Sequence, residues 1–152
     1  MHFYNLIKKI AEKNDILLYV DMDGVIASYD AGKPLDYENK RPLMENIRKI
    51  KKVSEIPNVE LFILSICMNN EQIQEKNNWL DKYADFFKYE NRVIISKENN
   101  VGISAPEIKT NYLKNLKSNK QIILLDDVNR ILKNVLKNAE NVIALQDSEL
   151  ID

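Results

Sequence analysis

The chain has 152 residues, of which 45% are hydrophobic and 30% are charged, and its 22 basic and 23 acidic residues leave a formal net charge of −1. These values predict a single globular domain over 1–152 and exclude a disordered chain. The near-balance of charge excludes nucleic-acid binding through overall positive charge, although not through a local basic patch. The single cysteine, Cys67, excludes a disulfide framework and a cysteine-based zinc cluster.

Two observations bear on the cellular compartment. No strongly apolar run is long enough to cross a bilayer, and the N-terminal residues show a helical pattern with Lys8 and Lys9 in place of a signal peptide. We therefore expect no membrane partner and a cytoplasmic protein, which the single cysteine also favours.

Helical and strand patterns alternate along the chain. Apolar residues at helical spacing predict helices, and short continuous apolar runs predict strands that are buried on both faces. In chain order we expect a helix over 3–13, a strand over 16–20, a helix over 42–54, a strand over 61–64, a helix over 70–88, a strand over 93–95, a helix after the capping box Ser104–Glu107, a strand over 122–125, a helix containing 131–136 and a strand over 142–145.

This alternation predicts an α/β fold: a doubly wound, Rossmann-like, mainly parallel sheet of five strands. The chain contains no internal repeat and no linker rich in proline, glycine or serine. The segments 27–41 and 97–104 are the expected loops. In such sheets, ligands bind beyond the carboxyl ends of the strands, so the residues that follow each strand are the first candidates for a site.

Four aspartates follow two of these strands: Asp21 and Asp23 after the first, and Asp126 and Asp127 after the fourth. Single acids after a strand are usually solvated loop residues, but four at one edge of a sheet would repel one another without a cation. Oxygen ligands favour a hard ion such as Mg²⁺. Gly24 permits a backbone turn beside the acids and the close approach of a ligand.

A hydroxyl and several lysines could complete an anion site. Ser65, which follows the second strand, could donate to a phosphate oxygen, although serine here is equally typical of a turn or a helix cap. Lys109 precedes the fourth strand by enough chain for a returning helix, which could bring its ammonium group to the acids to neutralise phosphate and carboxylate charge. Lys97 and Lys76 are alternatives for this role, and all three could instead be solvated.

Other chemistries lack the necessary residues. The one histidine, His2, lies at a terminus that we expect to fray, so a histidine-based triad is excluded. Cys67 has no arginine six residues later and is expected to be a buried, inert thiol. With three glycines there is no dinucleotide-binding fingerprint and no Walker loop. We expect aromatic residues to pack in the core: Trp79, Tyr83, Phe86 and Phe87.

The motifs resemble those of the haloacid dehalogenase-like (HAD) phosphohydrolases over nearly the whole chain. Asp21-Met22-Asp23-Gly24-Val25 is similar to motif one, Ser65 to motif two, Lys109 to motif three and Asp126-Asp127 to motif four. The resemblance implies a HAD-like core. It also implies that Asp21 is the nucleophile that forms an aspartyl-phosphate, and that Asp23 is the general acid and then the general base.

The same resemblance implies a cofactor and ligands. Mg²⁺ would be held by Asp21, by the backbone carbonyl of Asp23, and by Asp126, with Asp127 contributing directly or through water. Ser65 and Lys109 would hold the oxygens of the transferred phosphoryl group. The Asp-Met-Asp-Gly-Val run and Glu75-Lys76-Asn77-Asn78-Trp79-Leu80 resemble the 5′(3′)-deoxyribonucleotidases, but only a minimal flap fits between Val25 and Pro42, without a large cap domain.

The expected function is therefore Mg²⁺-dependent hydrolysis of a phosphomonoester, with a small molecule such as a nucleotide as the first candidate substrate. An open site would also suit nucleic-acid ends or a phosphoprotein, although the net charge does not indicate nucleic acid. A receiver-like signalling module and a non-catalytic HAD-like binding protein are the alternatives. The sequence does not indicate an oligomeric state.

Overall fold

Five strands and five α-helices alternate in the computed structural model, which describes residues 1–29 and 37–152. In chain order the elements are α1 (His2–Ala11), β1 (Ile16–Val20), α2 (Met44–Val53), β2 (Val59–Cys67), α3 (Glu71–Tyr83), β3 (Arg92–Ser96), α4 (Ala105–Lys114), β4 (Gln121–Asp126), α5 (Asn129–Asn138) and β5 (Val142–Gln146). The described residues also include four short 3₁₀ helices: η1 (Tyr37–Asn39), η2 (Tyr89–Asn91) and η3 (Lys97–Asn99) between these elements, and η4 (Asp147–Leu150) after β5.

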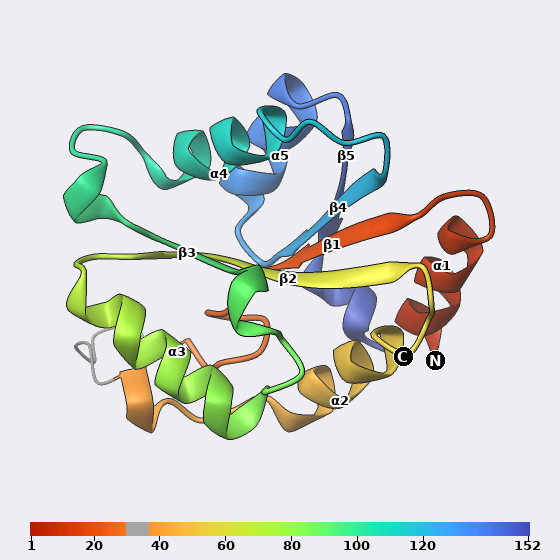
Figure 1. The fold of residues 1–152 in the computed structure, drawn as a ribbon, viewed down its shortest axis with the longest axis horizontal. Helices are drawn as coiled ribbons and strands as arrows, with labels where there is room; N and C mark the ends of the chain where they lie inside the picture. The colour runs from red at the N-terminus through yellow and green to blue at the C-terminus, as the bar shows by residue number, and fades with distance from the viewer. Residues whose placement is uncertain (30–36) are drawn as a thin grey trace.

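All five strands form one parallel sheet in the order β3-β2-β1-β4-β5 (Figure 1). The expected doubly wound α/β fold is confirmed, and the sheet is entirely parallel. β1 is the central strand and lies between β2 and β4. This order differs from the 2-1-3-4-5 order of receiver-like folds, so the receiver alternative is wrong.

Helices cover both faces of the sheet (Figure 1). α1, α2 and α3 pack on one face, and α4 and α5 pack on the other. Alternate residues of β1 divide between these layers: Leu18 and Val20 face α1–α3, whereas Leu17 and Tyr19 face α4 and α5. Every residue of β1 is buried because both faces are covered.

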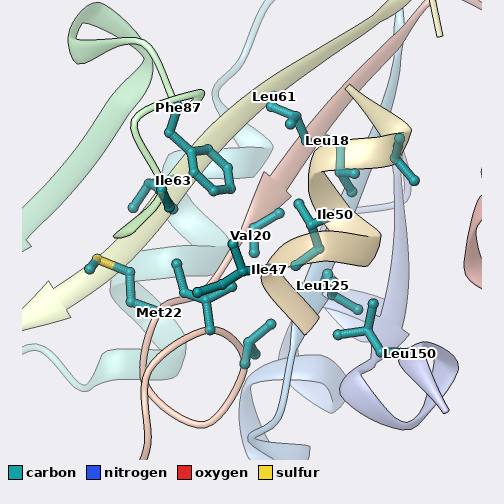
Figure 2. Close-up of a cluster of buried hydrophobic side chains, with 14 of the residues drawn as sticks. Leu18, Val20, Met22, Ile47, Ile50, Leu61, Ile63, Phe87, Leu125 and Leu150 are labelled. Atoms are coloured by element: carbon teal, nitrogen blue, oxygen red, sulfur yellow. The ribbon is translucent and has the colours of Figure 1, made fainter. Parts of the chain in front are cut away.

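The larger core lies between the sheet and α1–α3. Figure 2 shows Ile47 and Ile50 of α2 packed toward Leu18 and Val20 of β1, in a cluster that Leu150 of η4 also joins. Apolar residues of α2 at helical spacing meet apolar residues of the strand at a spacing of two, so each element buries one side against the other. The candidate site lies beyond the carboxyl ends of the strands that these layers enclose.

Several element boundaries differ from the prediction. β1 has the predicted bounds, but β2 is longer than 61–64 and includes Ser65, which therefore lies within the strand. α3 ends at Tyr83, well before residue 88, and Phe87 packs in the core from the segment after it. His2 does not fray, because it begins α1 and its side chain contacts Glu149.

Other predictions hold. The Ser104 hydroxyl accepts a hydrogen bond from the backbone N–H of Glu107 at the start of α4, as the capping box predicts. Cys67 is a free, buried thiol whose pKa is raised by burial. The predicted aromatic residues pack in or against the core, as expected.

No helix in the described part of the chain combines the length and the apolar character needed to cross a membrane. Part of the predicted flap lies outside the described residues.

Candidate active site

A cavity of about 330 Å³ opens at the carboxyl ends of the central strands. Its polar wall consists of Asp21, Asp23, Asp127 and Lys109. Its apolar wall consists of Tyr29, Ile66, Ala105, Val128 and Ile131. The cavity therefore lies where parallel α/β sheets bind ligands, and it combines a group of charges with an apolar surface.

The pairing of β1 with β4 brings Asp21 next to Asp126. Val20 is level with Leu125 in the parallel register, and the next backbone N–H, that of Asp21, donates to the carbonyl of Leu125 at 3.0 Å. Both aspartates continue the alternation that faces α4 and α5, so both carboxylates point to the same layer. Tertiary pairing thus joins two acids that are far apart in the sequence.

Lys109 of α4 reaches both of these carboxylates. Its ammonium group donates to Asp21 Oδ1 at 2.9 Å and to Asp126 Oδ2 at 2.7 Å, and all three residues are buried. The other oxygen of Asp126 accepts the backbone N–H of Val128 at 3.0 Å. The Lys109 ammonium, expected at the acids, is the one that reaches Asp21 and Asp126.

Asp127 adds a third carboxylate, and Gly24 makes room for it. Gly24 has φ +82°, and a Cβ atom at this position would lie 2.0 Å from Asp127 Oδ2. A side chain at residue 24 would therefore be strained by its backbone and would also collide with the carboxylate. Gly24 therefore leaves the space that the Asp127 carboxylate occupies in this structure.

The donor set fits a divalent cation. Carboxylate oxygens of Asp21, Asp126 and Asp127 all lie within 4.8 Å of one another. Asp127 Oδ1 is buried and has no hydrogen-bond partner among the described residues, which is costly unless a ligand is bound there. Three carboxylates face one lysine, and an oxygen-only set with excess negative charge suits a hard ion such as Mg²⁺. The Asp23 carboxylate is not part of this cluster.

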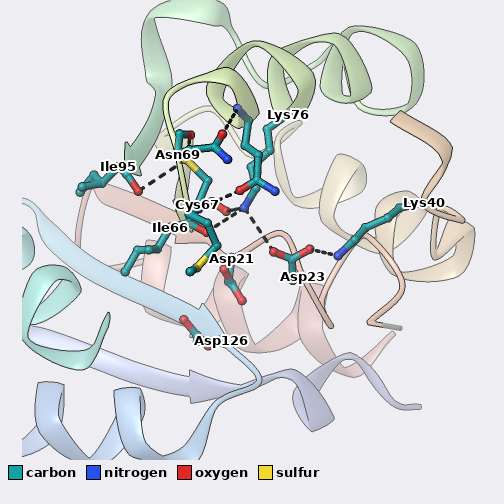
Figure 3. A network of polar contacts seen from close by, with 12 residues as sticks. Asp21, Asp23, Lys40, Ile66, Cys67, Asn69, Lys76, Ile95 and Asp126 are labelled. Carbon is teal, nitrogen blue, oxygen red and sulfur yellow. Dashed lines mark hydrogen bonds and ion pairs between the residues drawn. The ribbon is translucent and has the colours of Figure 1, made fainter. Parts of the chain in front are cut away.

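Asp23 lies between two other lysines (Figure 3). Lys40 donates to Asp23 Oδ1 at 2.7 Å, and Lys76 of α3 donates to Asp23 Oδ2 at 3.2 Å. Lys76 and Lys109 come from helices on opposite faces of the sheet. Asp21 and Asp23 are therefore paired with lysines from helices on opposite sides of the sheet.

Ser65 is fully buried in β2 and faces the α3 layer, where Lys76 donates to its Oγ at 2.6 Å. The same ammonium group also donates to the carbonyl of Ile66 at 2.9 Å. Ser65 is therefore linked to Asp23 through Lys76, a contact that sequence spacing did not predict. Lys97, the remaining alternative, is in η3 and makes no ion pair with the site among the residues that the structure describes.

The segment that carries Lys40 is hydrogen-bonded to α3. The indole N–H of Trp79 donates to the carbonyl of Lys40 at 2.9 Å, and Asn78 donates to Glu38 at 2.9 Å. The buried ring of Tyr37 lies beneath the ammonium groups of both Lys40 and Lys76, at 4.7 and 4.9 Å from the ring centre. These contacts hold the end of the flap beside Asp23.

Burial and charge move the pKa values of these acids in opposite directions. Burial raises the pKa of Asp21 to about 8, with Lys109 opposing this effect and Asp126 adding to it. The pKa of Asp23 is lowered because Lys76 and Lys40 together outweigh its burial. Burial also raises the pKa of Asp127. Without a bound cation, Asp21 therefore holds a proton more readily than Asp23 does.

The sequence analysis did not identify Lys40 and Tyr37 as site residues, and it assigned Lys76 to a different role. Nothing in the spacing of Lys40 or Tyr37 distinguished them from solvated loop residues. Lys76 was considered only as an alternative to Lys109, although a signal was available: it lies in the second turn of the helix that follows β2, close to the end of that strand. Its partners are Ser65 and Asp23.

The comparisons with known proteins support the fold. No protein-family model and no curated protein sequence matches the chain. Among solved structures, it is similar to a chain of the "Structure of Pnkp1/Rnl/Hen1 complex", with a TM-score of 0.67 and 14% sequence identity. The likeness covers 88% of this chain and 46% of that chain, so the chain spans less than half of its neighbour's length. At this identity, the likeness shows the fold alone.

Proposed function

We propose that the chain is a Mg²⁺-dependent phosphomonoester hydrolase that works through an aspartyl-phosphate on Asp21. The observation that carries the proposal is the convergence of Asp21, Asp126 and Asp127 around a buried Lys109, with one carboxylate oxygen of Asp127 lacking a partner among the described residues. The resemblance of the four motifs to the HAD phosphohydrolases agrees with this reading.

Asp21, Asp126 and Asp127 would hold the cation, together with the backbone carbonyl of Asp23. When bound, the cation supplies positive charge that lets an anionic nucleophile approach an anionic phosphate. Lys109 already bridges Asp21 and Asp126, so its ammonium group holds the nucleophile in place and adds charge beside the phosphoryl group. Ser65 would donate to a phosphoryl oxygen.

The reaction has two steps. In the first, a carboxylate oxygen of Asp21 bonds to phosphorus, the bond from phosphorus to the ester oxygen breaks, and the leaving oxygen takes a proton from Asp23. In the second, the Asp23 carboxylate takes a proton from water, the hydroxyl oxygen bonds to phosphorus, and the Asp21–phosphorus bond breaks to release phosphate. Covalent catalysis thus divides a difficult displacement into two easier ones.

The lysines around Asp23 suit the second step in particular. Because Lys76 and Lys40 lower the pKa of Asp23, the free protein presents a carboxylate that is ready to act as a base. A bound phosphoryl dianion adds negative charge next to Asp23 and opposes the lysines, which favours protonation for the first step. Lys40 is the more exposed of the two lysines, so solvent weakens its interaction with Asp23 more than that of Lys76.

The proposal is tested by phosphate release from p-nitrophenyl phosphate, nucleoside monophosphates and oligonucleotides phosphorylated at the 5′ or 3′ end, each with Mg²⁺ and with EDTA. We expect turnover with Mg²⁺ only, and Asp21→Asn to abolish it. Turnover confined to oligonucleotides would assign the chain to nucleic-acid ends. Absence of Mg²⁺-dependent turnover across the panel would favour the non-catalytic alternative, and full activity of Asp21→Asn would overturn the aspartyl-phosphate on Asp21.

A further inference from the structure

Lys76 is a buried lysine with every donor engaged. Its side chain is 2% exposed, and its ammonium group donates to Ser65 Oγ, Ile66 O and Asp23 Oδ2. An ammonium group has three N–H donors, so three acceptors saturate it. Removing such a charge from water costs free energy. One ion pair at 3.2 Å with a partly exposed carboxylate offsets little of this cost, so stability alone does not explain the buried lysine.

The bond to Ser65 decides what the serine hydroxyl can do. Because Lys76 has no acceptor capacity, Ser65 Oγ must accept this hydrogen bond, and the serine's own hydrogen is left to donate elsewhere. Within the described part of the chain, Ser65 Oγ donates to no protein acceptor. Lys76 therefore leaves the serine hydrogen unused; Ser65 is fully buried and does not line the cavity, but the next residue, Ile66, does.

The bond to Asp23 fixes one carboxylate oxygen relative to that hydroxyl. Lys40 holds the other oxygen, but it belongs to the flap, whereas Lys76 projects from α3, which packs on the core. Figure 3 shows Lys76 between Asp23 and the end of β2. One ammonium group thus joins two residues with different roles in the proposed reaction.

We infer that Lys76 is a positioning residue that orients both the Ser65 hydroxyl toward the phosphoryl oxygens and the Asp23 carboxylate toward the leaving group. This inference rests on the proposed function and adds a residue to it. Among the described residues, Lys76 makes no hydrogen bond or ion pair with Asp21, Asp126 or Asp127, and it contacts Asp23 through the side-chain carboxylate and not through the backbone carbonyl. We therefore expect the cation to bind without it.

The test compares Lys76→Met with wild type on two substrates with Mg²⁺: p-nitrophenyl phosphate, whose leaving group needs no proton, and the best nucleoside 5′-monophosphate, whose leaving group does. Loss of an oriented general acid costs about 10²-fold or more, so we expect kcat/KM to fall by about 10²-fold on the nucleotide and by less than about 10-fold on p-nitrophenyl phosphate. A merely structural role would lower both equally.

A double-mutant cycle isolates the serine. If Lys76 acts on p-nitrophenyl phosphate through Ser65, then Lys76→Met combined with Ser65→Ala is no worse on that substrate than Ser65→Ala alone. Additive losses on p-nitrophenyl phosphate, or equal losses on both substrates, would overturn the inference. Lys82→Met, an exposed lysine of the same helix, is the matched control and should behave as wild type.

Folding and the proposed function are checked separately. We expect Mg²⁺ to raise the melting temperature of Lys76→Met as much as that of wild type. If Lys76→Met does not fold, Lys76→Gln, which keeps a hydrogen-bond donor, replaces it in the same comparison. If wild type itself lacks Mg²⁺-dependent turnover, the proposed function fails and the inference fails with it. If wild type is active and Lys76→Met keeps its substrate selectivity, only the inference fails.

Discussion

At the residue scale, the candidate site depends on where single carboxylates lie relative to single cations. Asp21 shares Lys109 with Asp126, whereas Asp23 is held by Lys40 and Lys76. Two aspartates that are separated by one residue therefore have opposite electrostatic surroundings. This difference suits the roles that we propose, a nucleophile beside a cation for Asp21 and an acid and base for Asp23.

Gly24 gives a direct test of the proposed cation site. Gly24→Ala forces a side chain onto a backbone with φ +82° and against Asp127, so we expect a loss of stability of about 1–2 kcal/mol and a weakened response of the melting temperature to Mg²⁺. Gly102→Ala is the matched control, because Gly102 has φ +80° but nothing within 4 Å of the added atom. An unchanged Mg²⁺ response in Gly24→Ala would show that Asp127 is not a ligand.

Asp21 gives a prediction about pH. Its pKa is raised from 3.8 to about 8 in the folded protein, so the folded state keeps a proton that the unfolded state has lost. The contribution of Asp21 to the free energy of unfolding is therefore fully present below pH 3.8 and declines as pH rises toward about 8. Urea titrations in EDTA between pH 5 and 8 should show a steeper decline for wild type than for Asp21→Asn. Parallel curves would contradict this assignment.

At the element scale, helices carry the lysines to the strand ends. α4 brings Lys109 from one face of the sheet and α3 brings Lys76 from the other. The Ser104 cap defines the start of α4, and Lys109 lies five residues after it. The sequence indicated this helix and its cap, but the reach of Lys109 to two strands depends on how α4 packs.

Ser104→Ala tests the cap. The hydrogen bond from Glu107 N to Ser104 Oγ is long, 3.4 Å, so we expect a loss of about 0.5–1 kcal/mol in the free energy of unfolding, at the low end for such caps. Urea denaturation measures this difference. Ser118→Ala removes an exposed serine from a turn and should cost less; an equal cost would show that the cap is not what stabilises α4.

At the scale of the whole molecule, β1 connects the two layers and the site. It lies at the centre of the sheet, all of its residues are buried, and Asp21 and Asp23 follow its last residue. A defect in β1 therefore affects both cores, whereas a defect on the outer surface of a helix affects neither.

Leu18→Ala tests the central role of β1. Leu18 is fully buried, so we expect a loss of about 2–5 kcal/mol in the free energy of unfolding from lost burial and the cavity that remains. Leu136→Ala, at an exposed leucine of α5, should cost far less. Comparable losses for the two variants in denaturant titrations would mean that β1 is not the centre of the core.

The sequence by itself determined the order of helices and strands, the doubly wound fold and the set of acids at the strand ends, because apolar periodicity and the residues after each strand are local features of the chain. Only the tertiary structure decided which cation meets which acid. The pairing of β1 with β4 joins Asp21 to Asp126, and the packing of α3 and of the flap brings Lys76 and Lys40 to Asp23. A long, flexible lysine can reach many points from its backbone, so its partner depends on packing between segments that are distant in the sequence.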